Sequence, residues 1–178
     1  MILRGAAHRY GDDIDTDVII PAASLAFGDT AMFARLCMTP LDPAFPDRVR
    51  RGDIIVAGRN FGCGSSREQA PMALQAAGIA AVVAVSVARI FHRNAINRGL
   101  PVLICPEAVA AIGMGETIAV DPAAETVTVG NRVCNAAPMP PAMRAILDAG
   151  GLVPFVRAEL ARRERLGQSG PQRSEGRA

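Results

Sequence analysis

The segment from Asp53 to Ile104 constrains the fold most, because short apolar runs alternate there with helical segments that end at glycine. Runs rich in Val, Ile and Ala predict buried strands, and a glycine directly after a helical pattern predicts a helix end. The expected strands are residues 53–58, 79–85 and 100–104, and the expected helices are residues 67–77, closed by Gly78, and 86–98, closed by Gly99. This order of elements is typical of parallel βαβ units, so the chain is predicted to be an α/β protein.

The flanking segments carry weaker patterns. An N-terminal strand is expected within residues 1–10, and three closely spaced prolines predict an irregular connection over residues 39–52. The elements expected after Cys105 are a short helix at 107–112, strands at 116–120 and 126–129, and helices at 141–149 and 154–166. We expect one domain over residues 1–166 and a mobile tail over residues 167–178, because the tail has no apolar anchor.

Composition and charge exclude several classes of protein. Half of the 178 residues are apolar and a fifth are charged, which is enough to bury a core. The net charge is only +2, and the basic excess lies after residue 156, so no nucleic-acid partner is expected. The chain also shows no signal-peptide pattern and no apolar run near the ~20 residues of a spanning helix. We therefore expect a cytoplasmic protein with no membrane partner.

The four cysteines, Cys37, Cys63, Cys105 and Cys134, are widely spaced and form no CxxC pair. Zinc sites and iron–sulfur clusters usually show closely spaced ligands, so this chain is expected to hold no metal of its own. Three of the cysteines are expected to be small buried apolar groups. Cys63 differs because it lies in a glycine-rich loop.

That loop, GRNFGCGSSREQ at 58–69, joins a predicted buried strand to a helix N-terminus. Oriented N–H groups at such a terminus favour an anion, and Gly62 and Gly64 allow close approach of the backbone to a ligand. Arg67 offers a planar fork for a carboxylate or phosphate. Either Ser65 or Ser66 is expected to be the N-cap of the helix.

Three kinds of chemistry are compatible with such a loop. A nucleotide loop would need a third glycine where Arg67 stands, and a Walker loop would need a lysine, which the chain lacks. A serine nucleophile would need a GxSxG pattern, and no motif links His8 or His92 to a serine. The third possibility is a carboxylate-binding loop whose serine acts on the substrate, which the residue types alone do not select.

Three stretches of the chain resemble signature stretches of a known family. They are GDDIDTDVIIP at 11–21, AGRNFGCGSSREQAP at 57–71 and SVARIFHRNAINRGLPVL at 86–103. In order and spacing they look like those of the small subunit of 3-isopropylmalate dehydratase, the separate swivelling domain of the aconitase superfamily. The resemblance implies a swivelling β/β/α domain and a larger partner subunit. It also implies a [4Fe-4S] cluster held by that partner's cysteines, with none bound by this chain.

The resemblance also assigns roles to residues. Ser65 matches the catalytic base, Arg67 matches a ligand of the substrate carboxylate, and Ser66 is a hydrogen-bond donor beside them. Gln69 stands where the family usually has histidine, so this position cannot relay a proton. The stretch Ser24, Leu25, Ala26 and Phe27 matches the family's specificity loop but lacks its usual Tyr-Leu start. Ala26 carries no charge for a third carboxylate, which favours an alkyl-substituted hydroxy-dicarboxylate substrate over a tricarboxylate.

The resemblance therefore implies a hydro-lyase subunit that isomerises 2-isopropylmalate and 3-isopropylmalate in leucine biosynthesis, active only with its large subunit. One alternative is a related hydroxydiacid dehydratase acting on 2,3-dimethylmalate or a citraconate-type substrate. Another alternative is a carboxylate-binding module without catalysis, although such a module would need Arg67 but no serine base.

Overall fold

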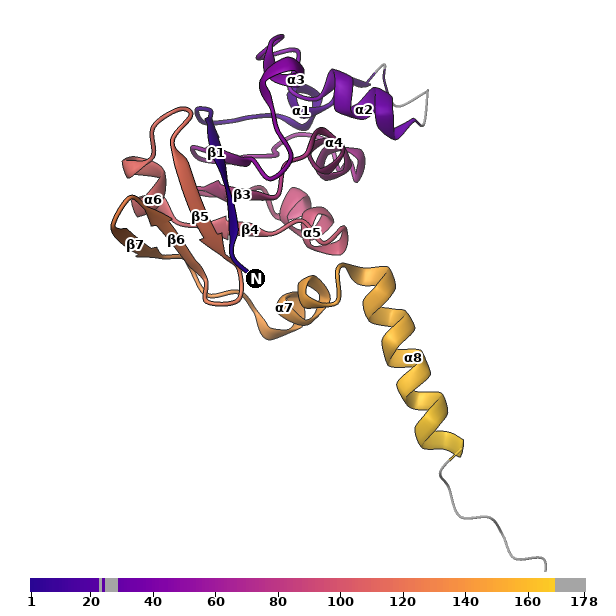
Figure 1. Ribbon diagram of the computed structural model, residues 1–178. Coiled ribbons are helices and arrows are strands. Elements are labelled where there is room, and N and C mark those ends of the chain that lie inside the picture. The colour runs from indigo at the N-terminus through magenta and orange to yellow at the C-terminus, as the bar shows by residue number, and fades with distance from the viewer. Residues whose placement is uncertain (23, 25–28, 169–178) are drawn as a thin grey trace, which may run out of the picture.

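A computed structural model describes residues 1–22, 24 and 29–168 of the chain (Figure 1). The strands are β1 (Leu3–Arg9), β2 (Ile54–Ala57), β3 (Ala81–Ala84), β4 (Val102–Ile104), β5 (Thr117–Asp121), β6 (Thr126–Val129) and β7 (Arg132–Asn135). The helices are α1 (Thr16–Ile19), α2 (Thr30–Leu36), α3 (Phe45–Arg48), α4 (Gln69–Ala77), α5 (Arg89–Asn97), α6 (Pro106–Ala111), α7 (Pro141–Asp148) and α8 (Leu152–Gln168).

The strands form one mixed sheet in the order β4-β3-β2-β1-β5-β6-β7. The four strands from β4 to β1 are parallel, with pairs such as Ile55 with Val82 in register. The other three strands continue from β1 as an antiparallel meander. The predicted βαβ units over residues 53–104 are therefore confirmed. Because the carboxyl ends of the parallel strands share one edge of the sheet, the loops that follow them lie together.

Both faces of the parallel part are covered by apolar layers. Alternate residues of β2, β3 and β4 pack in a layer with α2, α4 and α5, namely Ile55, Ala57, Val82, Ala84 and Val102. The other residues face α6 and the meander, namely Ile54, Val56, Ala81, Val83 and Leu103. Figure 1 shows α4 and α5 on one side of these strands and α6 with the meander on the other. Burial on both faces explains why β2 and β3 read as unbroken apolar runs.

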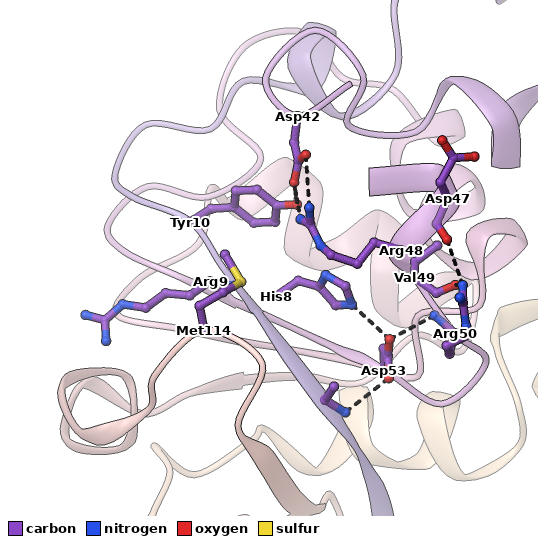
Figure 2. Close-up of polar contacts among 11 residues, drawn as sticks. His8, Arg9, Tyr10, Asp42, Asp47, Arg48, Val49, Arg50, Asp53 and Met114 are labelled. Atoms are coloured by element: carbon purple, nitrogen blue, oxygen red, sulfur yellow. Dashed lines mark hydrogen bonds and ion pairs between the residues drawn. The ribbon is translucent and has the colours of Figure 1, made fainter. Parts of the chain in front are cut away.

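A buried polar pair ties the first strand to the start of the second. His8 on β1 and Asp53, directly before β2, place Nε2 and Oδ2 2.8 Å apart, and both residues are buried. Asp53 also accepts hydrogen bonds from the backbone N–H groups of Ala6 and Arg50, as Figure 2 shows. The ring of His8 meets that of Phe45 edge to face. His8 is thus a packing group within the fold.

The structure corrects the expected elements at several places. Helix α2 and strand β7 fall in segments where no element was predicted, and α3 lies inside the connection expected to be irregular. Asp29 caps α2 by accepting a hydrogen bond from the N–H of Ala31. No helix in the described part of the chain is long and apolar enough to cross a membrane.

The C-terminal helix is longer than expected. Helix α8 begins at Leu152 and continues to Gln168, beyond the predicted end at residue 166, and it extends away from the sheet (Figure 1). Residues 167 and 168, which were predicted to belong to the mobile tail, are therefore part of this helix. Residues 169–178, the rest of that tail, lie outside the described residues.

Candidate functional site

The candidate site is built from two loops that run side by side after β1 and β2. The N–H of Gly58 donates to the carbonyl of Gly11, and the N–H of Arg59 donates to the carboxylate of Asp12. Further along, Gly62 N–H donates to the carbonyl of Ile14 at 2.7 Å. These bonds fix the glycine-rich loop against the acidic turn of residues 11–17. Adjacency of two parallel strands thus brings together two of the sequence stretches singled out above.

Thr16 holds the segment that carries the serines. Its backbone N–H donates to the carbonyl of Cys63 at 2.8 Å, and its Oγ1 donates to the carbonyl of Ser65 at 3.0 Å. Thr16 itself is buried, because α1 packs against α4. The backbone around Ser65 is therefore positioned by the first loop and not by the helix that follows it.

At two positions of the loop, Gly62 and Gly64, no residue with a side chain fits. Gly62 has φ of +74°, and a Cβ there would lie 2.2 Å from the ring of Phe91. Gly64 has φ of +88°, and a Cβ there would lie 2.2 Å from Oδ2 of Asp15. Both positions combine a left-handed backbone with close approach of a neighbouring side chain. The glycine spacing noted in the sequence thus shapes the loop.

The third signature stretch, residues 86–103, packs against the glycine-rich loop. Phe61 N–H donates to the carbonyl of Ser86, and Ala88 N–H donates to the carbonyl of Phe61. The rings of Phe61 and Phe91 pack edge to face with centroids 5.1 Å apart, and both rings are fully buried. An apolar anchor under the loop leaves little room for it to shift.

The two serines are exposed and are not helix caps. Helix α4 begins at Gln69 with Glu68 as its N-cap, so the expectation that Ser65 or Ser66 caps it is wrong. The two hydrogen bonds from Thr16 to the carbonyl groups of Cys63 and Ser65 form what we call the Thr16 tether. Because of this tether, the helix begins about one turn after Ser65. Within the described residues, the hydroxyls of Ser65 and Ser66 have no hydrogen-bond partner. Both hydroxyls are consequently free to meet a ligand.

Arg67 lies beside the serines and is held by an acidic residue from the other loop. Its guanidinium forms an ion pair with Asp17 in the first turn of α1. The Arg67 side chain is 15% exposed, whereas that of Asp17 is 51% exposed. Gln69 is half-buried at the first position of α4. An arginine fork two residues from an exposed serine, at the start of a helix, is an arrangement that binds carboxylates.

The surroundings of Cys63 disfavour its thiolate form. Burial, followed by the negative charges of Asp15 and Asp13, raises the pKa of its thiol. Among the described residues, no group of three or more His, Cys, Asp or Glu side chains is placed to hold a metal ion. The raised pKa favours a neutral thiol at Cys63.

The predicted specificity stretch is only partly described. Ser24 is buried, and its Oγ donates to the carbonyl of Pro21 at 2.6 Å. Leu25, Ala26 and Phe27 lie outside the described residues. Sequence reasoning did not place Asp17 among the site residues, although its acidic turn belongs to the first signature stretch. Its role depends on the pairing of β1 with β2, which no local pattern reveals.

Comparison with known proteins defines the class of this fold and site. Residues 39–107 match the family model of the aconitase C-terminal domain. A solved structure of 3-isopropylmalate dehydratase from Methanocaldococcus jannaschii superposes with a TM-score of 0.88 at 43% identity, covering 93% of this chain and 99% of that one. The chain therefore has the swivelling β/β/α fold of the aconitase superfamily, as the resemblance implied.

Curated relatives narrow the class to one family. The 3-isopropylmalate dehydratase small subunit of Moorella thermoacetica is 52% identical over 158 residues, covering 88% of this chain and 95% of the relative. The 2,3-dimethylmalate dehydratase small subunit of Eubacterium barkeri is 49% identical over 161 residues, covering 89% of this chain and 98% of the relative. The chain belongs to the family of 3-isopropylmalate dehydratase small subunits.

Proposed function

We propose that this chain is the small subunit of a hydro-lyase that interconverts 2-isopropylmalate and 3-isopropylmalate by dehydration and rehydration, a step of leucine biosynthesis. The names of several relatives at about half identity support this assignment. The observation that carries it is the exposed Ser65 hydroxyl on a tethered loop, two residues before the Arg67 fork. A binding module would need the fork alone.

In this proposal Ser65 removes the proton α to a substrate carboxylate. A serine hydroxyl is a weak acid, so its alkoxide needs strong local stabilisation. The guanidinium of Arg67, two residues along the chain, and the positive end of α4, which begins at Gln69, are the groups proposed to supply it. Arg67 binds the carboxylate next to the reacting carbon, and Ser66 donates a hydrogen bond beside it. These groups orient the C–H bond toward Oγ of Ser65.

The remaining chemistry belongs to a larger partner subunit. We assign the ligands of a [4Fe-4S] cluster to that partner, because the donor atoms of this loop, a neutral thiol among acidic residues, form no set suited to it. When bound, such a cluster supplies a Lewis acid that polarises the substrate hydroxyl. This chain's part is to bring the base and the carboxylate fork to the same substrate.

A dehydratase of 2,3-dimethylmalate is the second candidate. It is favoured by the relative from Eubacterium barkeri, which is nearly as similar as the isopropylmalate enzymes. Both substrates are alkylated malates, so the same base and fork serve either reaction. The two substrates differ in alkyl volume, and the specificity stretch at residues 24–27 is expected to select between them.

Reconstitution tests the proposal. The full chain is purified alone, and it is also purified with the cluster-loaded large subunit of the same organism. Hydration of the dehydrated intermediate is followed by absorbance. We expect no turnover by the chain alone and turnover by the complex. Activity of the iron-free chain alone would refute the proposal, as would a complex that forms but turns over neither alkylated malate.

A further inference from the structure

A groove of about 510 Å³ lies beside the candidate site, at the same edge of the sheet. It is bounded by α6 and by the residues that follow the carboxyl ends of β1, β2 and β3. Its lining includes Gly11, Asp12, Gly58, Val85, Val109 and Met114. Because Gly11 and Asp12 also bind the loop that carries Ser65, the groove and the candidate site share one wall.

The outer rim of the groove is the turn at residues 112–116, which four hydrogen bonds hold in place. Gly113 N–H donates to the carboxylate of Glu116, and Gly115 N–H donates to the carbonyl of Ala7. The guanidinium of Arg9 donates to the carbonyl of Ile112, and the N–H of Arg9 donates to the sulfur of Met114 at 3.4 Å. Figure 2 shows Met114 against the strand at Arg9. The groove therefore exists before anything enters it, which lowers the entropy cost of binding.

The chemistry of the groove selects an apolar occupant. Met114 is 57% exposed, a large apolar side chain at the mouth of the groove. Each of three polar side chains at its border makes a hydrogen bond within the chain. Arg9 donates to Ile112, Tyr10 donates to Asp42 at 2.8 Å, and Asp12 accepts from Arg59. A small polar ligand would need convergent polar groups that are free, so it is disfavoured here.

We propose that this groove receives an apolar side chain of the cluster-bearing large subunit when the complex forms. The inference rests on the proposed function. Ser65 and Arg67 act only if the partner covers this edge of the sheet, and a partner covering them also lies over the adjoining groove. A second copy of this chain seated in the groove would block the face that the large subunit needs. Methionine is well suited to such a contact, because its flexible thioether adapts to the partner's shape.

Two variants of the full chain test the groove directly. Met114→Asp places a charge at its mouth, and Ala110→Trp fills it from an exposed position on α6. Val153→Asp is the matched control, because Val153 is 59% exposed on α8, away from the groove. The dissociation constant for the cluster-loaded large subunit is measured by titration calorimetry. The thermal unfolding of each chain alone shows whether it still folds.

We expect Met114→Asp and Ala110→Trp each to weaken binding at least about tenfold, the range of a central interface residue, with unfolding temperatures close to wild type. Val153→Asp is expected to change Kd by less than about twofold. Unchanged affinity in either groove variant would overturn the inference, even if the wild-type complex is fully active. Absence of binding by the wild-type chain would instead refute the proposed function, so the two failures are distinguishable.

Discussion

Asp17 and Arg67 form an ion pair that links the first turn of α1 to the loop before α4. The pair uses Nη1 of the guanidinium, which leaves Nε and Nη2 for a second carboxylate. Asp17 is in turn positioned by its own N–H, which donates to the N-cap Asp15 at 2.7 Å. We infer that Asp17 holds the fork of Arg67 in place before substrate binds.

Replacing Asp17 with asparagine tests this positioning role. Without the carboxylate, the fork must be ordered by the substrate, at the expense of substrate binding. We expect KM of the reconstituted complex to rise about tenfold and kcat to fall much less. Asp47→Asn, a change of an exposed carboxylate on α3, is the control. An unchanged KM in Asp17→Asn, or an equal loss in the control, would contradict the role.

Ser65→Ala is expected to abolish turnover without affecting assembly. The hydroxyl is exposed and has no described partner, whereas the tether from Thr16 reaches the backbone carbonyl and survives the change. A positioned general base contributes about 10²–10⁴-fold, so kcat should fall by at least ~100-fold. Ser66→Ala is expected to cost less. The base lies elsewhere if Ser65→Ala retains more than about a tenth of the wild-type kcat.

The Thr16 tether makes a separate prediction. Thr16→Val keeps the shape of the buried side chain but leaves the carbonyl of Ser65 without its 3.0 Å partner. Loss of one such hydrogen bond should lower the free energy of unfolding by about 1 kcal/mol. We expect a fall in kcat well beyond what this small loss of stability explains, because the base is displaced. Full activity with reduced stability would show that the tether serves the fold alone.

Stability at acid pH is expected to depend on Asp53. Burial would raise the pKa of its carboxyl, but the hydrogen bonds from His8, Arg50 N–H and Ala6 N–H outweigh burial and lower it. Because the folded pKa lies below the unfolded value of about 3.9, the stabilisation is complete above that pH. It is lost as the pH falls through the folded pKa.

Asp53→Asn removes this titration and tests its sign. We expect the variant to lose about 2 kcal/mol of unfolding free energy at pH 7 and to lose less additional stability on acidification than wild type. Denaturant unfolding between pH 3 and pH 7 measures both effects. An acid dependence identical to that of wild type would contradict the assignment to Asp53.

The strands and helices that the sequence predicted best are those whose patterns are local. The run Ile54–Ala57 is apolar at every position because both faces of the strand are buried, so it is visible in the sequence. Gly78 is visible as the end of α4 because it adopts a left-handed φ of +103°. Strand β7 was missed because Cys134 is the one residue of its four that is buried, so the segment has no apolar pattern. Its existence depends on pairing with β6.

The sequence proposed the residues of the site but could not predict the contacts that position them. The resemblance assigned Ser65, Ser66 and Arg67, and these three lie together at the edge of the sheet. The Thr16 tether and the Asp17 ion pair both cross between segments about fifty positions apart. The tether also explains why the serines are not caps, since tertiary bonds override the local capping preference.

The central claim is tested most directly by a panel of kcat/KM values for the reconstituted complex. The panel comprises 3-isopropylmalate, 2,3-dimethylmalate and homocitrate, assayed with wild type and with Ala26→Arg. We predict that the wild-type complex prefers 3-isopropylmalate. The resemblance matches Ala26 to the position that meets the variable substrate group, and alanine offers no charge to pair with a third carboxylate taken out of water. Ala26→Arg should shift the preference toward homocitrate by about tenfold or more, through a charge-assisted pair. Efficient turnover of homocitrate by the wild-type complex, or a preference for 2,3-dimethylmalate, would contradict the proposed function.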